Sequence, residues 1–114
     1  MMKFNDNTSF VYIVTNPGRS TLYIGVTNNL SARLIEHWCN KGNNNSFAGK
    51  YYCYNLIYFE EFQDINIAID RETELKKWSR GKKEKLISTK NPEWFFLNEK
   101  ICGCWPPENI IKRF

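Results

Sequence analysis

The chain has 114 residues, a formal net charge of +4 and 42% hydrophobic residues. Domains usually contain about 100–150 residues, so this length predicts one domain over residues 1–114 and excludes a second core. The composition excludes wholesale disorder. No apolar run approaches the ~18 residues of a membrane helix. Because residues 1–7 also lack an apolar signal segment, we expect an intracellular, cytoplasmic protein with no membrane partner.

We expect the four cysteines to be ordinary free thiols. In a reducing compartment disulfides do not persist, and only Cys102 and Cys104 lie close together in the sequence. Their CxC spacing differs from the C-x₂-C of most zinc sites, although His37, the only histidine, could complete a ligand set. A buried free cysteine packs well as a small hydrophobic residue, and we favour that interpretation over a structural metal.

Two N-terminal segments predict a β-hairpin. Residues 10–14 and 22–26 are rich in β-branched and aromatic side chains, and Pro17-Gly18 between them is a strong turn signal. If the hairpin is symmetrical about this turn, the numbers of paired residues add up to about 35 by the usual antiparallel pattern. Tyr12 would then lie directly opposite Tyr23.

Further elements follow at regular intervals. Asn28-Asn29 offers a helix N-cap, and the helix it begins should end near residues 40–42. A strand is predicted within residues 51–62, a second helix from about Asn66 and a third over residues 82–89. The apolar side chains of the second helix lie on one arc, which we expect to pack against the core: Ile67, Ala68, Leu75 and Trp78.

This order of elements predicts an α+β fold, in which a small antiparallel sheet packs against three helices. The sheet would consist of the N-terminal hairpin and the third strand. We expect a core over residues 10–87 and an apolar C-terminal tail, residues 88–114, that packs on or near the core.

Charge is distributed unevenly along the chain. The segment from Glu60 to Leu75 contains six acidic residues and one basic residue. The segment from Lys76 to Lys90 contains seven basic residues and one acidic residue. A solvated helix surface with acids early and bases late would explain this, as the helix dipole favours. A footprint for a nucleic-acid backbone would also explain it. The candidate phosphate contacts are Lys76, Lys77, Arg80, Lys82 and Lys83.

Several polar residues lie beside the predicted core. Arg33 and His37 are four residues apart, so their side chains are neighbours at the edge of the first helix's apolar stripe. Glu72 has a similar edge position on the second helix. Each has an ordinary explanation when taken alone: a surface charge, a core-edge histidine, or an i,i+4 pair between Glu72 and Lys76.

Taken together, these residues resemble the GIY-YIG nuclease domain over residues 10–87. The resemblance extends to the small stand-alone members of that family, which are related to the N-terminal domain of an excinuclease. Val11 stands where the family's first motif has glycine, a substitution common in that subgroup. The matching segments are Val11-Tyr12-Ile13, Tyr23-Ile24-Gly25, residues 28–37, residues 71–80 and residues 91–94.

The resemblance implies a metal-dependent endonuclease that hydrolyses phosphodiester bonds in DNA, in repair or recombination. Glu72 would be the only protein ligand of Mg²⁺ or Mn²⁺, which suits an ion that keeps most of its waters. Arg33 would contact the scissile phosphate. Either Tyr12 or His37 would be the base. Tyr23 would hold the water or the phosphate, and Gly25 would leave room for the backbone to approach.

Two other functions remain open from the sequence. The same fold and basic segment could bind nucleic acid without cutting it, in which case binding would depend on salt but not on Mg²⁺. Alternatively, the chain could dock on a repair-protein partner through its aromatic tail, residues 94–114.

Overall fold

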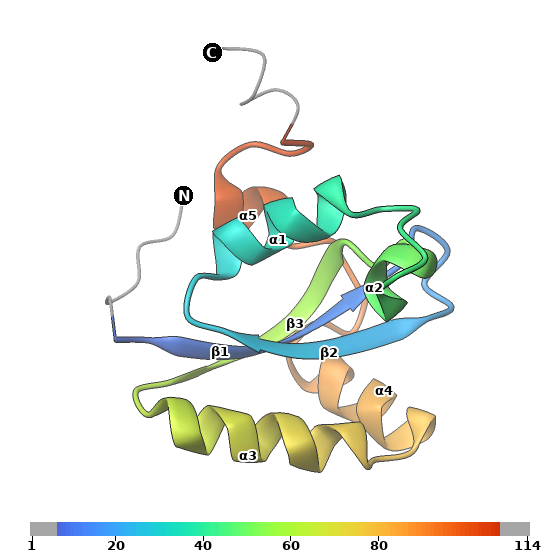
Figure 1. Cartoon of the computed structure of the whole chain (residues 1–114). Coiled ribbons are helices and arrows are strands. Elements are labelled where there is room, and N and C mark those ends of the chain that lie inside the picture. The colour runs from blue at the N-terminus through green and yellow to red at the C-terminus, as the bar shows by residue number, and fades with distance from the viewer. Residues whose placement is uncertain (1–6, 108–114) are drawn as a thin grey trace.

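A three-stranded antiparallel sheet with helices on both faces forms the centre of the molecule (Figure 1). The computed structural model describes residues 7–107. The strand order is β2-β1-β3. The α+β prediction is confirmed. The elements are β1 (Ser9–Thr15), β2 (Leu22–Thr27), α1 (Leu30–Cys39), α2 (Phe47–Lys50), β3 (Asn55–Phe62), α3 (Ile65–Lys76), α4 (Arg80–Lys90) and α5 (Asn98–Cys102).

The central strand β1 is buried on both faces because each face of the sheet has its own helical layer. Helices α1, α2 and α5 cover one face, and α3 and α4 cover the other (Figure 1). Alternate side chains of β1 therefore enter two cores. Phe10, Tyr12 and Val14 pack toward α1 and α5, whereas Val11 and Ile13 pack toward α3 and α4.

The predicted register of the hairpin is wrong by two residues. Tyr12 pairs with Gly25, and Tyr23 pairs with Val14, so paired numbers sum to 37. The turn does lie at Pro17-Gly18, where the Arg19 N–H donates to the carbonyl of Asn16. The side chain of Asn16 then accepts hydrogen bonds from the backbone N–H groups of residues 20 and 21 and lengthens one side of the loop. A shift of two residues keeps Tyr12 and Tyr23 on the same face.

Capping side chains set where the helices begin. Asn29 Oδ1 accepts from the Ala32 N–H at the start of α1, as predicted. Helix α3 begins one residue earlier than expected, at Ile65, behind the cap Asp64. On α3, Ala68 and Leu75 are buried as predicted, but Ile67 is 54% exposed, so that part of the predicted arc is wrong. Ile67 lies 100° around the helix from Ala68 and so points away from the sheet.

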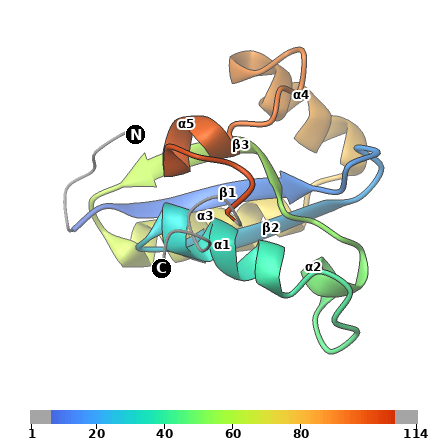
Figure 2. The same cartoon turned by 90° about the horizontal axis from the view of Figure 1, so that it is seen from above.

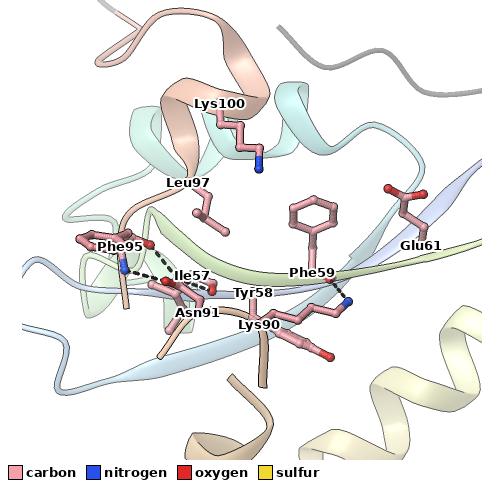
Figure 3. Close-up of a pocket in the computed structure, with 9 residues that line it drawn as sticks. All are labelled: Ile57, Tyr58, Phe59, Glu61, Lys90, Asn91, Phe95, Leu97 and Lys100. Carbon is pink, nitrogen blue, oxygen red and sulfur yellow. Dashed lines mark hydrogen bonds between the residues drawn. The ribbon is translucent and has the colours of Figure 1, made fainter. Parts of the chain in front are cut away.

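Two short helices, α2 and α5, were not predicted. Helix α5 belongs to a C-terminal segment that runs beside the edge strand β3 (Figures 2 and 3). The Leu97 N–H donates to the Leu56 carbonyl, and the Asn91 side chain donates to the Ile57 carbonyl. A cavity of about 450 Å³ remains between β3 and this segment, with Phe59, Phe95 and Leu97 in its lining. The parts of the expected N-terminus and tail at residues 1–6 and 108–114 lie outside the described residues.

Within residues 7–107, no helix combines the length and hydropathy needed to span a bilayer. The four cysteines are free thiols: Cys53 and Cys102 are buried, Cys104 is half-buried and Cys39 is exposed. The same part of the chain contains no cluster of three or more His, Cys, Asp or Glu side chains suited to a metal ion.

Candidate active site

Tyr12 lies at the centre of the candidate site, fully buried between β2 and α1. Its hydroxyl is hydrogen bonded to Nε2 of His37 at 2.8 Å. The ring lies over Gly25, its partner in β2, so closely that a Cβ there would approach Tyr12 Cζ to 2.6 Å. The glycine therefore makes the space that lets the tyrosine reach His37.

Three other predicted site residues, on α1 and β2, lie around Tyr12: Arg33, His37 and Tyr23. Helix α1 presents Arg33 and His37 one turn apart, and β2 presents Tyr23, whose ring centroid is 5.5 Å from that of His37. Arg33 Nε pairs with Glu36 at 3.1 Å, and the side chain of Arg33 is 37% exposed. A pocket of about 210 Å³ opens here; its lining is Tyr23, Arg33, Glu36, His37, Asn40, Ser46, Phe47 and Ala48.

Burial controls the protonation of the two hydrogen-bonded groups. Burial raises the pKa of Tyr12 well above its ordinary value, and the charges of Tyr23 and Glu72 raise it further, while Arg33 opposes them. Burial and the nearby Arg33 charge lower the pKa of His37 to about 4. At neutral pH the phenol and the imidazole are therefore both uncharged, and His37 has an unprotonated ring nitrogen.

We expect His37 to titrate near pH 4 instead of 6.5, its ordinary value. Because the folded pKa is lowered, the stability linked to His37 is complete above pH 6.5 and is lost as the pH falls from there toward 4. His37 is the only histidine, so its ring resonances in an NMR titration can be assigned directly. Arg33→Met should raise the midpoint by removing a nearby positive charge. A wild-type midpoint at 6.5 would contradict the burial argument.

Glu72 belongs to the opposite helical layer. It lies on α3, which packs against β1 and β2 on the face away from α1 (Figure 1). Its side chain is 17% exposed, and its charge acts on the Tyr12 hydroxyl. The i,i+4 pairing considered from the sequence is present, because Lys76 Nζ lies 3.5 Å from Glu72 Oε2.

The donor chemistry at Glu72 fits Mg²⁺ or Mn²⁺. Mg²⁺ is commonly held by one or two carboxylates and completes its shell with water and substrate phosphate. Glu72 offers one such carboxylate, already paired with a cation, the half-exposed Lys76 ammonium. A bound divalent ion would replace the Lys76 ammonium as the positive charge beside the Glu72 carboxylate.

The five predicted phosphate contacts do not form one uniform patch. Arg80 donates to the carbonyls of Arg19 and Ser20 and pairs with Glu84, so it fastens α4 to the β1–β2 loop. Lys76 pairs with Glu72. The other three are Lys77, which is exposed, Lys82, whose Nζ lies 4.1 Å from the Trp78 ring centroid, and the half-buried Lys83.

Sequence reasoning missed the contribution of α2 to the pocket. Ser46 caps this helix, and Phe47 stacks on Tyr23 with ring centroids 6.3 Å apart and an interplanar angle of 26°. Residues 42–46 are polar and predict a loop, and four helical residues are too few for apolar periodicity. The one available signal was Ser46 as a potential N-cap.

The model of the GIY-YIG catalytic domain matches residues 8–85, which include all five predicted catalytic residues. The chain belongs to the GIY-YIG family. It is 38% identical to a UPF0213 protein of Clostridium perfringens over 73% of this chain and 86% of the relative. A UPF0213 protein of Natronomonas pharaonis is 33% identical over 69% of this chain and 89% of the relative.

Among solved structures, the solution structure of the UPF0213 protein BH0048 from Bacillus halodurans has 29% identity and a TM-score of 0.48. That match covers 76% of this chain and 89% of the other. The predicted family resemblance is confirmed by the match to the catalytic-domain model. A GIY-YIG catalytic domain implies nuclease activity in general.

Proposed function

We propose that this GIY-YIG protein is a divalent-metal-dependent endonuclease that hydrolyses phosphodiester bonds in DNA. The observation that carries the proposal is the Tyr12–His37 hydrogen bond beside Arg33, at the pocket that Arg33 and His37 line. A repair or recombination role, a nucleic-acid partner and a cytoplasmic location are parts of the same proposal.

His37 is the general base in this proposal. It lines the pocket and is uncharged at neutral pH, whereas Tyr12 is fully buried and its pKa is raised. In the tautomer that this role requires, Nε2–H donates to the Tyr12 oxygen. Nδ1 is then the nitrogen that takes the proton of the attacking water.

Arg33 and Tyr23 bind the substrate phosphate at the pocket. Arg33 presents a planar fork of donors to two phosphate oxygens and stabilises the charge that develops during attack. The Tyr23 hydroxyl helps to hold the water or the phosphate. Glu72 would hold the metal, which when bound would polarise the phosphoryl group and stabilise the leaving oxygen.

The test is cleavage of labelled single-stranded, duplex, flapped and branched DNA in Mg²⁺ or Mn²⁺, with EDTA as the blank. We expect cleavage that needs the metal and that is lost in Glu72→Gln, because the amide removes the charge that holds the ion. Glu84→Gln is the matched control, since Glu84 is also paired at i,i+4, with Arg80, but lies on α4. Cleavage in EDTA, or undiminished cleavage by Glu72→Gln, contradicts the proposal. Salt-sensitive binding without cleavage would instead establish a binding module.

A further inference from the structure

Two exposed aromatic side chains, Phe47 and Tyr51, border the candidate active site; we call them the α2 aromatic surface. Phe47 is 52% exposed and lines the pocket, while its ring also stacks on Tyr23. The ring centroids of Phe47 and Tyr51 are 4.8 Å apart. Aromatic rings therefore extend without a break from the pocket to the solvent.

The short helix that carries this surface is firmly attached to the end of α1. The Gly42 N–H donates to the Gly49 carbonyl at 2.8 Å, and the Ser46 hydroxyl accepts from the Gly49 N–H. A Cβ at Gly49 would lie 2.6 Å from the Asn40 carbonyl oxygen, so the two segments are in close contact. A surface held in this way loses little conformational entropy when a ligand stacks on it.

The charge around the α2 aromatic surface favours a polyanion. Lys50 is exposed, and Glu36, the one acidic residue in the pocket lining, is paired with Arg33. Lys50 Nζ lies 5.4 Å from the centroid of the Tyr51 ring. Exposed rings interleaved with cations are typical of surfaces that bind single-stranded nucleic acid.

We propose that Phe47 and Tyr51 form a stacking subsite for an unpaired nucleobase next to the phosphate held by Arg33. This inference rests on the proposed function and adds a substrate class to it. A base can stack on an external ring only after leaving the base stack of a duplex. The substrate therefore carries unpaired nucleotides beside the cleaved bond, as in a flap, a loop or a single strand.

Binding in EDTA tests the subsite without cleavage. The two probes are fluorescein-labelled oligo-dT and an abasic oligonucleotide of the same length and charge. Wild type should bind oligo-dT about 5- to 150-fold more tightly, the range that stacking of one base provides. Phe47→Ala should lose most of this preference and Phe47→Tyr should keep it. Both should retain the wild-type affinity for the abasic probe, because the cationic contacts are unchanged.

Phe95→Ala is the matched control. Phe95 is 64% exposed and lines the cavity beside β3 (Figure 3), whereas Phe47 lines the pocket beside α1. Tyr51→Ala is a second, independent variant, and circular dichroism verifies that each variant is folded. Equal affinity of wild type for the two probes would overturn the subsite, as would an equal loss in Phe47→Ala and Phe95→Ala.

Cleavage separates this inference from the proposed function. In Phe47→Ala, the preference for flapped over duplex DNA should fall by a similar factor, about 5- to 150-fold. Metal-dependent cleavage by a protein without base-dependent binding overturns the subsite alone. Conversely, Phe47-dependent binding of oligo-dT by a protein that cuts no substrate supports the subsite and overturns the nuclease.

Discussion

Arg33→Met is expected to slow DNA cleavage about 10²- to 10³-fold, the usual cost of removing one donor that stabilises transition-state charge. Arg33 lies at the pocket one helical turn from His37, where a phosphate would be within reach of both side chains. Arg33→Lys should recover only part of the rate, because an ammonium restores the charge but not the planar pair of donors.

The fold should tolerate these substitutions. The Arg33 side chain is 37% exposed, and its partner Glu36 is more exposed still, so their ion pair adds little stability. We expect the free energy of unfolding to change by no more than ~0.5 kcal/mol. Single-turnover cleavage and urea unfolding measure the two effects separately. Lys85→Met, which removes an exposed cation from α4, is the control for lost charge. Wild-type cleavage rates in Arg33→Met would contradict a role at the phosphate.

The sequence predicted those parts of the fold that depend on local chemistry. Asn29 caps α1 because its side chain accepts a nearby N–H, and that signal requires no knowledge of the tertiary fold. The register of the hairpin was missed because it depends on hydrogen bonds of the Asn16 side chain with residues 20 and 21. A Pro-Gly turn alone does not indicate that longer loop.

In the candidate site, too, the features that depend on local spacing could be predicted, and those that depend on tertiary contacts could not. Arg33 and His37 could be placed together from helical spacing, and the shared face of Tyr12 and Tyr23 survived the register error because strand periodicity is two. The influence of Glu72 on Tyr12 could not be predicted in this way, since Tyr12 packs toward α1 whereas Glu72 lies on α3, in the other helical layer. Only the resemblance to the family placed Glu72 in the site; neither spacing nor charge pattern did so.

Gly25→Ala is expected to destabilise the protein by about 2–3 kcal/mol, toward the upper end for overpacking a core. The added Cβ would overlap the outer part of the fully buried Tyr12 ring. The ring would have to move, and the hydrogen bond between its hydroxyl and His37 Nε2 would weaken. Cleavage should therefore fall as well. Urea unfolding and cleavage rates measure the two consequences.

Gly81→Ala is the glycine control, because a Cβ at Gly81 meets nothing within 4 Å. At that position in α4, alanine should leave the free energy of unfolding unchanged or raise it by up to ~1 kcal/mol, as its helix propensity favours.

A double-mutant cycle identifies the cause of the loss at Gly25. Tyr12→Leu removes the ring atoms that the new methyl group would meet, so Gly25→Ala should cost far less in that background than in wild type. The coupling free energy should account for most of the ~2–3 kcal/mol expected from overpacking. An equal cost in both backgrounds would mean that the glycine serves the strand itself and not the position of Tyr12. The absence of a side chain at Gly25 would then no longer explain how a buried tyrosine reaches the imidazole of His37.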